Sequence, residues 1–402
     1  MKVLFSIPSI GSVYGGPSKT VTDLAQALNQ KYDVLVDIVT TNANGNRNLS
    51  EPLQQWLSKS GYRIQYFPYI SCGDYKWSNS FASWLDSNIS QYDVVHTNAI
   101  FSLPNIPVYL ACKKYRIPYV ITPHGMLEPW AFSYKAWKKK LFYNLLEKPA
   151  LNRASAIQAL ATPEAEHIKR LNVDSPISVI PNGIHKHDFE SSKGPELFYK
   201  KYPELRDKKN ILFLGRIDPK KGLDLLAKAF GRIHPHFLDS HLIIAGPDNI
   251  GFLAEAQKFF KEQRCEQAVT FTGMLTGSLK ESALAVADIY VAPSYSEGFS
   301  MSILEGMASG LPCIITKGCN FPEAHVANAA YVVDIESNAI AEALTKCLEN
   351  PASASEVGKH ARHFILENYT WDKVAEKMMA LYRTIQPQIN SSAFKNNALT
   401  HS

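Results

Sequence analysis

The sequence predicts an α/β protein with two Rossmann-like, doubly wound domains that face each other across a cleft. The chain has 402 residues, which is too long for one ordinary core and suits two domains of about 150 to 200 residues. Short apolar runs alternate with helical patterns along both halves of the chain. Glycine-containing polar segments follow several of these runs, at the place where such sheets bind ligands.

The first half of the chain contains apolar runs of strand length. The expected strands are Val3 to Pro8, Val34 to Thr40, Val94 to Thr97 and Tyr119 to Thr122. Between the first two, Thr20 to Asn29 carries apolar residues at helical spacing. Apolar strands that alternate with helices indicate a parallel sheet covered on both faces.

The second half repeats the alternation. Its expected strands are Ile211 to Leu214, Leu242 to Ala245, Val269 to Thr272, Ile289 to Ala292, Cys313 to Thr316 and Tyr331 to Val333. The polar stretch from His185 to Lys209 lacks periodicity and is interpreted as a linker. We therefore expect one domain over residues 1–187 and a second domain over residues 188–370.

Two segments remain at the C-terminus. Trp371 to Ile385 has a helical pattern, so a helix is expected over residues 371–387. Residues 388–402 are rich in Asn, Ser, Ala and Thr without periodicity, and we expect a disordered tail there.

Composition disfavours several classes of protein. Hydrophobic residues make up 46% of the chain and charged residues 20%, which is typical of a globular protein. The formal net charge of +5 is mild, so no nucleic-acid partner is expected. The six cysteines form no C-x-x-C pair, which favours reduced thiols in the cytosol. The N-terminus does not resemble a signal peptide, and no run reaches the roughly 18 apolar residues of a spanning helix. A cytoplasmic location is expected, with peripheral attachment to the inner face of the membrane as an open alternative.

The loop after the first expected strand contains Gly15-Gly16-Pro17. Two glycines let the backbone approach a ligand closely and offer N–H donors to a phosphate. A simple turn would also use a glycine pair, so this loop alone does not decide between the two.

The loop after Ile211 to Leu214 contains Arg216 and Lys221, five residues apart. A guanidinium fork and an ammonium at a strand end, beside a helix N-terminus, suit a pyrophosphate. A solvated basic turn is the alternative.

The segment after Ile289 to Ala292 carries two carboxylates, Glu297 in a loop and Glu305 about one turn into a helix expected to end at Gly310. Backbone N–H groups from Gly298 to Ser302 could face an anion, and the carboxylates could accept hydrogen bonds from sugar hydroxyls. Alternatively, Ser302 and Glu305 have the spacing of a capping box.

Together these segments resemble the retaining GT-B glycosyltransferases of sequence family 4 over nearly the whole chain. Five pieces occur in the order found in that family. They are Gly15-Gly16-Pro17, His124-Gly125, Pro181-Asn182-Gly183-Ile184, the Gly-Arg…Lys-Gly pattern of residues 215 to 222, and the glutamates Glu297 and Glu305.

The resemblance implies that residues 1–187 form the acceptor-side domain and residues 188–370 the nucleotide-sugar-binding domain, and it implies roles for single residues. Arg216 and Lys221 would grip the donor diphosphate, Glu297 would contact the sugar hydroxyls, and Glu305 would hold the ribose. His124 would line the sugar pocket, which with Glu297, Arg216 and Lys221 makes up the expected catalytic set. The remaining expected donor-binding residues are Gly15, Gly16, Gly298, Phe299, Ser300 and Met301. The helix over residues 371–387 resembles the family element that crosses back to the first domain and forms part of the hinge.

The sequence departs from the commonest family pattern at Ser300-Met301-Ser302, where Gly-Leu-Pro is usual. This difference concerns local backbone contacts and not the carboxylates. No Asp-x-Asp pair occurs in the chain, so the carboxylate-bound metal of other glycosyltransferases has no candidate site. We expect no cofactor and no metal.

The resemblance implies retaining transfer of a hexosyl group from a UDP-, GDP- or ADP-linked sugar to a glycan or lipid-linked acceptor. A synthase of the sucrose or trehalose type, with a soluble acceptor, and a non-catalytic nucleotide-sugar binder are the alternatives. A Rossmann oxidoreductase is disfavoured because the first loop lacks G-x-G-x-x-G.

The segment from Tyr134 to Leu151 is the candidate for contact with a membrane. Lysines and large apolar residues recur in it at helical spacing, and such a basic amphipathic helix can lie on an anionic surface. An ordinary helix packed on the sheet, with its lysines in water, is the alternative.

Overall fold

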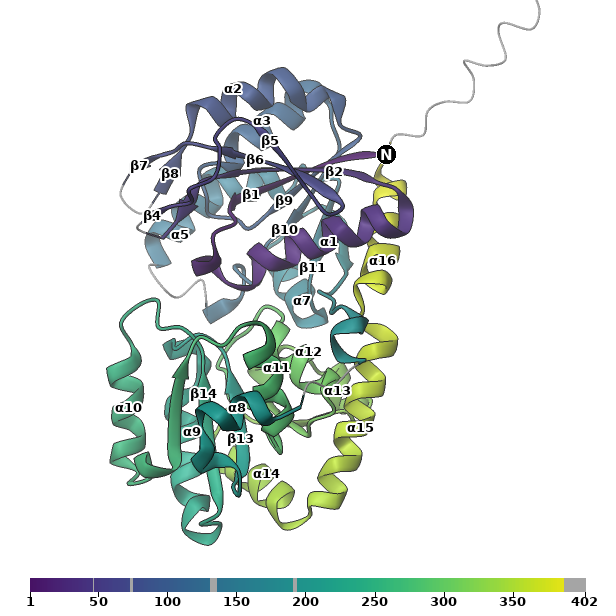
Figure 1. Cartoon of the computed structure of the whole chain (residues 1–402). Coiled ribbons are helices and arrows are strands. Elements are labelled where there is room, and N and C mark those ends of the chain that lie inside the picture. Colours follow the sequence, from purple (N-terminus) through teal and green to yellow (C-terminus); the bar gives the residue numbers. More distant parts are fainter. Residues whose placement is uncertain (46, 73–74, 131–135, 191–193, 387–402) are drawn as a thin grey trace, which may run out of the picture.

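The computed structural model describes residues 1–45, 47–72, 75–130, 136–190 and 194–386. The tail expected over residues 388–402 lies outside them. Figure 1 shows two lobes, one above the other, with the C-terminal helices running along one side of both.

The upper lobe in Figure 1 contains an eight-stranded sheet. Its strands, in spatial order, are β12 (Ile177–Val179), β11 (Ala156–Ala159), β10 (Tyr119–Thr122), β9 (Val94–Asn98), β1 (Lys2–Ser9), β2 (Leu35–Thr41), β6 (Tyr62–Phe67) and β5 (Trp56–Lys59). The edge strand β5 runs antiparallel to β6, and the other neighbours in the sheet are parallel. The sheet therefore has the predicted parallel core.

Helices cover both faces of this sheet. They are α1 (Gly16–Tyr32), α2 (Asn79–Asn88), α3 (Asn105–Tyr115), α5 (Ala136–Phe142), the π-helical turn η3 (Tyr143–Glu147), α6 (Lys148–Leu151) and α7 (Thr162–Arg170). Two short hairpins, β3 (Ala43–Asn44) with β4 (Arg47–Asn48) and β7 (Ile70–Cys72) with β8 (Tyr75–Trp77), extend from it. Along β1, Leu4 belongs to one apolar cluster and its neighbours Val3 and Phe5 to the other, because successive side chains point to opposite faces.

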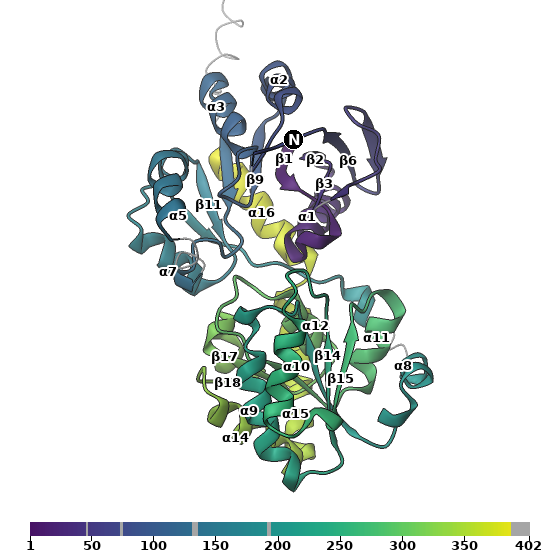
Figure 2. The same ribbon diagram turned by 90° about the vertical axis from the view of Figure 1, so that its left-hand side faces the viewer.

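The lower lobe contains a six-stranded, all-parallel sheet. Its strands, in spatial order, are β15 (Val269–Gly273), β14 (Ser240–Ala245), β13 (Lys209–Leu214), β16 (Ile289–Ala292), β17 (Cys313–Thr316) and β18 (Tyr331–Val333). Its helices are α8 (Glu196–Lys201), α9 (Leu223–Ile233), α10 (Leu253–Glu262), α11 (Gly277–Val286), α12 (Met301–Ala308), α13 (Glu323–Val326), α14 (Ser337–Glu349) and α15 (Pro351–Asn368). Figure 2, turned by 90°, shows this lobe below the first and helices on either side of its strands.

The stretch from His185 to Lys209 is more than the predicted linker. It contains α8, and the side chains of Phe198 and Leu205 are fully buried in the core of the second sheet. The expectation is therefore wrong for this part of the stretch. Only a few side chains of this stretch reach the core, so its sequence shows little apolar periodicity. The periodicity therefore did not predict the helix.

Helix α16 (Trp371–Ile385) packs against the first sheet, although it follows the helices of the second. Trp371, Met378 and Tyr382 are buried in the same cluster as Val3 and Phe5 of β1. The Tyr382 hydroxyl lies 2.6 Å from Nδ1 of His96 on β9. The C-terminal helix thus ties the two lobes together.

Two further features concern whole-chain expectations. The five cysteines whose side chains the structure describes, Cys112, Cys265, Cys313, Cys319 and Cys347, are buried free thiols. Among the described helices, none combines the length and the apolar character that crossing a membrane requires.

Candidate active site between the two domains

The N-terminus of α1 lies at the carboxyl end of β1 and begins with the predicted glycine pair. Gly15 is the N-cap and has φ of +76°, a backbone conformation that favours glycine. A Cβ added to Gly15 or Gly16 would meet no atom within 4 Å. The helix therefore opens onto free space, where its first N–H groups can face a ligand.

The turn after β10 carries the predicted histidine. His124 has φ of +55°, and its Nε2 lies 3.0 Å from Oδ1 of Asn98 at the end of β9. Burial lowers the pKa of His124 to about 4. The imidazole is therefore neutral near pH 7, so it can form a hydrogen bond with a ligand but not an ion pair.

A glutamate that the sequence did not indicate holds this turn. The fully buried Glu164 accepts hydrogen bonds from the backbone N–H groups of Gly125 and Leu160, each at 2.7 Å. Burial raises the pKa of Glu164 to about 7, although both hydrogen bonds oppose that shift. The residue lies 39 positions from Gly125, so no local motif connects the two.

The loop between β13 and α9 contains several positively charged side chains. Its 3-10 turn η6 (Pro219–Lys221) is capped by Asp218, which accepts a hydrogen bond from the N–H of Lys220 at 3.0 Å. Burial and the like charges of Lys221 and Arg216 lower the pKa of Lys220. Gly222 ends the turn at φ of +68°, and a Cβ there would overlap the carbonyl of Pro293.

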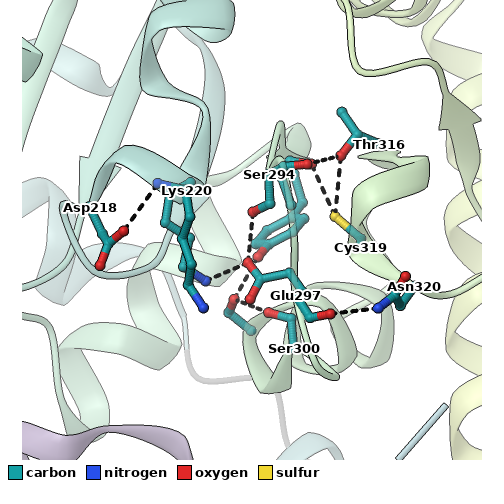
Figure 3. Close-up of polar contacts among 12 residues, drawn as sticks. Asp218, Lys220, Ser294, Glu297, Ser300, Thr316, Cys319 and Asn320 are labelled. Atoms are coloured by element: carbon teal, nitrogen blue, oxygen red, sulfur yellow. Dashed lines mark hydrogen bonds and ion pairs between the residues drawn. The ribbon is translucent and has the colours of Figure 1, made fainter. Parts of the chain in front are cut away.

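Glu297 lies at the centre of the polar network drawn in Figure 3. Its Oε1 is 2.5 Å from Nζ of Lys221 and 2.7 Å from the hydroxyl of Ser294. Its side chain is 8% exposed. Burial acts to raise the pKa of Glu297, but the charges of Lys221 and Lys220 and the hydrogen bonds bring that pKa below its usual value. The carboxylate is therefore ionised near pH 7.

Helix α12 begins at Met301 with Ser300 as its N-cap, close to the predicted start. Ser302 therefore lies inside the first turn, where its hydroxyl contacts that of Tyr290 at 2.8 Å. Glu305 lies further along the helix, and its carboxylate pairs with Nζ of Lys280 at 2.7 Å. The capping-box alternative for Ser302 and Glu305 is thus wrong, since neither side chain caps the helix.

Two of the expected donor-binding residues face the core of the second domain. The Phe299 ring packs against the rings of Phe321 and Tyr369, and Met301 packs on the same cluster. Their side chains anchor the loop between Glu297 and α12.

The two domains touch at a pair of glycines. A Cβ on Gly125 would fall 2.5 Å from Cα of Gly298, and a Cβ on Gly298 would fall 2.9 Å from Cα of Gly125. The turn that carries His124 therefore rests directly on the loop that carries Glu297. Nearby, the Asn249 side chain donates a hydrogen bond to the Val13 carbonyl at 3.0 Å, which also joins the two domains.

The structure thus brings some of the predicted site residues into contact with one another. Lys221 and Glu297 are paired, and the turn after His124 meets Gly298. Glu305 is paired with Lys280, a residue that the sequence did not indicate because it lies on another helix. In the described part of the chain, no group of three or more His, Cys, Asp or Glu residues could hold a metal ion.

Comparisons with known families match both halves of the chain. Residues 14–187 match the family described as Glycosyltransferase Family 4, and residues 196–364 match that described as Glycosyl transferases group 1. A phosphatidyl-myo-inositol mannosyltransferase of Mycobacterium tuberculosis is 29% identical over 214 residues, which are 51% of this chain and 53% of that protein. The chain spans about half the length of the curated relatives that it matches first.

Solved structures match nearly the whole chain. Sucrose-phosphate synthase from Thermosynechococcus elongatus superposes with a TM-score of 0.76 at 21% identity, covering 96% of this chain and 99% of that one. The Anabaena protein HepE, in a complex with UDP and glucose, superposes with a TM-score of 0.77 at 19% identity, covering 96% and 100%. This likeness confirms the predicted architecture of two Rossmann-like domains.

Proposed function

Since the chain belongs to the family 4 glycosyltransferases of the GT-B fold, we propose that it transfers a hexosyl group from a nucleotide-diphosphate sugar to an acceptor hydroxyl. The acceptor is a glycan or a lipid-linked molecule, and the product belongs to a polysaccharide or an envelope glycoconjugate. The anomeric configuration is retained, which is typical of this family.

The observation that carries this proposal is the pairing of Lys221 with Glu297 beside Arg216 and Lys220. A diphosphate would compete with Glu297 for Lys221 and would offset the like charges of the three cations. Glu297 would then be free to accept hydrogen bonds from sugar hydroxyls. Donor binding thus replaces an internal ion pair by contacts with both parts of the donor.

The ribose of the donor is assigned to Glu305. Its carboxylate is 14% exposed and already oriented by Lys280, so it can accept hydrogen bonds without a search through rotamers. The backbone N–H groups at the start of α12 and the Gly15-Gly16 end of α1 would face the phosphates.

In the proposed mechanism, the bond between the anomeric carbon and the diphosphate breaks, and negative charge grows on the leaving phosphate. Arg216, Lys221 and the helix-end amides would stabilise that charge electrostatically. The leaving phosphate would take the proton of the acceptor hydroxyl, and the acceptor oxygen would bond to the anomeric carbon on the same face of the sugar. The neutral His124 would position the sugar by a hydrogen bond, and Glu297 is not a nucleophile in this scheme. We propose that no metal takes part.

The acceptor proposal is supported by the apolar surface around α5. Tyr134 and Lys135 lie outside the described residues, but Trp137, Leu141 and Leu145 are 71%, 55% and 65% exposed. Other residues of the segment, such as Tyr143 and Leu151, are buried against the first sheet, as in the alternative of an ordinary surface helix, whereas these three side chains are largely exposed. With Lys140 also exposed, they form a basic and apolar surface that suits an anionic membrane or a lipid-linked acceptor.

Vesicle binding tests this surface. Replacing Leu141 and Leu145 by Ser should weaken partitioning onto vesicles of anionic phospholipid, whereas Leu238→Ser, at an equally exposed site of the other domain, should not. Equal partitioning of both variants would remove the membrane from the proposal and favour a synthase of the sucrose or trehalose type with a soluble acceptor.

The donor is tested first by thermal shift with UDP, GDP and ADP, and then by transfer from the matching nucleotide sugars to lipid extracts or soluble sugars. Arg216→Ala should lose most of the turnover.

Retention is read from the anomeric NMR signals of the product, and an inverted product would contradict the mechanism. Activity that EDTA abolishes would contradict metal independence. If the protein binds a nucleoside diphosphate but neither transfers the sugar nor hydrolyses the donor, the result would favour the alternative of a non-catalytic nucleotide-sugar binder.

A further inference from the structure

Three segments of the first domain meet at one edge of its sheet. The 3-10 turn η1 (Ser12–Tyr14) follows β1, the β3–β4 hairpin follows β2, and the β7–β8 hairpin follows β6. Because β1, β2 and β6 are parallel neighbours, the three segments lie at the carboxyl edge of the sheet, where α/β proteins bind ligands. Figure 1 shows both hairpins at the same end of the upper lobe. The donor site proposed above uses neither hairpin.

The side chain of Tyr14 joins these segments. Its hydroxyl accepts a hydrogen bond from Nζ of Lys76 on β8 and another, at 3.0 Å, from the N–H of Gly45 in the β3–β4 hairpin. Nζ of Lys76 also lies 5.3 Å from the centre of the Tyr69 ring, within the range of a cation–π contact. Both Tyr14 and Lys76 are half-buried. Two tyrosines thus hold the ammonium group in place.

The contacts of Tyr14 and Lys76 leave hydrogen-bond donors without acceptors. A tyrosine hydroxyl can accept with its oxygen and donate one proton, and here its oxygen already accepts two hydrogen bonds. The ammonium group has three N–H bonds, of which Tyr14 takes one. Among the residues that the structure describes, no carboxylate pairs with Lys76 and no acceptor takes the Tyr14 proton. Free donors beside a positive charge suit an anionic group, such as a carboxylate or a phosphate.

The turn η1 is held beside the proposed donor site. The N–H of Tyr14 donates to the carbonyl of Gly11 at 3.0 Å. A Cβ added to Gly11 would fall 2.9 Å from the carbonyl oxygen of Ala43, so the turn rests directly on β3. Gly15, the N-cap of α1, follows Tyr14, and the residue before Tyr14 accepts the interdomain hydrogen bond from Asn249. Tyr14 therefore adjoins both the end of α1 assigned to the phosphates and the second domain.

We propose that Tyr14 and Lys76 bind an anionic group of the acceptor, either a carboxylate or a phosphate, so that an acidic acceptor is preferred to a neutral one. This inference rests on the proposed function. The donor sugar is assigned to His124 after β10 and to Glu297 of the second domain, which leaves the edge at β2 and β6 for the acceptor. Binding of the donor diphosphate and mere fastening of the β7–β8 hairpin to η1 are the alternatives.

Transfer to fractionated acceptors tests the proposal. A glycan and lipid extract of cells in which the protein occurs is separated by anion exchange into a neutral and an acidic fraction. Transfer of labelled sugar to each fraction is measured at limiting acceptor for wild type, Lys76→Met and Tyr14→Phe. Lys59→Met, at an exposed position of β5 in the same domain, is the matched control. Each protein is also titrated with whichever of UDP, GDP and ADP the wild type binds.

We expect the label in the acidic fraction. There, Lys76→Met should lower kcat/KM for the acceptor roughly tenfold or more, and Tyr14→Phe roughly threefold, because each loses a hydrogen bond to an anion. Affinity for the nucleoside diphosphate should stay within about twofold of wild type, and Lys59→Met within about twofold in both measurements. Chemical reduction of the carboxylates, or removal of phosphates by a phosphatase, should abolish the advantage of wild type over Lys76→Met. The effective treatment identifies the anion.

Several outcomes would overturn the proposal. They are transfer to the neutral fraction alone, equal transfer by wild type and Lys76→Met, and an advantage of wild type that survives both treatments. An equal loss of transfer and of diphosphate affinity would also overturn it and would place Lys76 at the donor. A lower melting temperature with unchanged transfer would show that the pair only fastens the hairpin. Wild-type protein that transfers sugar to neither fraction would instead refute the proposed function, on which the inference rests.

Discussion

Nζ of Lys221 lies 2.5 Å from Oε1 of Glu297, and both side chains are about nine-tenths buried. The two residues come from loops that follow neighbouring strands, β13 and β16, 76 positions apart in the chain. The cation assigned to the phosphate and the carboxylate assigned to the sugar are thus partners of each other. An ion pair in such a position keeps both groups charged and oriented.

The first prediction concerns this pair. Lys221→Ala leaves Glu297 buried without its charged partner, so the free energy of unfolding should fall by about 3 kcal/mol or more. Turnover should fall by roughly 10² or more, because the leaving phosphate loses a cation. Urea unfolding and donor hydrolysis measure the two effects.

A double-mutant cycle gives the control for the pair. Adding Glu297→Gln to Lys221→Ala should recover part of the lost stability, since no buried charge then remains unpaired. Lys200→Ala, at an exposed position of α8, should change neither quantity. Turnover that survives Lys221→Ala would remove this lysine from the site.

The second prediction concerns the glycine contact between the domains. Gly298→Ala places a methyl group 2.9 Å from Cα of Gly125, so the domains cannot approach as they do in the structure. We expect kcat/KM to fall at least roughly tenfold while the circular dichroism spectrum is unchanged. Gly194→Ala is the matched control, because its added Cβ meets no atom within 4 Å. Equal activity of both variants would show that the glycine contact is not needed for turnover.

The third prediction separates ribose from phosphate. Glu305→Gln keeps the shape of the side chain but weakens its hydrogen bonds to hydroxyls and its ion pair with Lys280. Affinity for the preferred nucleoside diphosphate should fall roughly tenfold in calorimetry, and affinity for inorganic pyrophosphate should stay within about twofold. A similar loss for both ligands would place Glu305 near the phosphates instead.

The fourth prediction concerns pH and the docking of α16. His96 is fully buried, and burial followed by the charge of His124 lowers its pKa to about 3. An unfolded histidine has a pKa near 6.5, so the unfolded state binds more protons between these two values. The stabilising effect of a neutral His96 is therefore lost as the pH falls below about 6.5.

Urea unfolding at pH 7 and pH 5 tests this effect. His96 should account for about 2 kcal/mol of the stability lost between the two values. His96→Asn should show a correspondingly smaller pH dependence, whereas His236→Asn, at an exposed position, should match wild type. Glu147 and Glu164, whose pKa values burial raises to about 7, change the free energy of unfolding in the opposite direction over this pH range. Their contribution is common to wild type and variant, so it cancels when the two pH dependences are compared. Equal slopes for wild type and His96→Asn would contradict the prediction.

Local patterns in the sequence were enough for the second sheet, for β1, β2, β9 and β10 of the first sheet, and for the start of α12, but they did not predict β5, β6, β11 or β12. Runs of apolar residues mark the strands because strands buried on both faces have little choice of side chain. Ser300 marks the helix start because few residue types suit a helix N-cap. The resemblance to the family then assigned Lys221 and Glu297 to different parts of one donor.

The sequence by itself determined the fold class, the loops at the strand ends and the ionisable residues in them, since these depend on periodicity and short motifs. Only the tertiary structure decided the partners: Glu164 for Gly125, Lys280 for Glu305, and Asn320 for Glu297. It also decided that Leu141 and Leu145 face solvent. Each of these facts joins residues far apart in the chain or depends on what covers a surface. Hydrogen bonds and burial are properties of three-dimensional packing, and no local pattern in the chain encodes them.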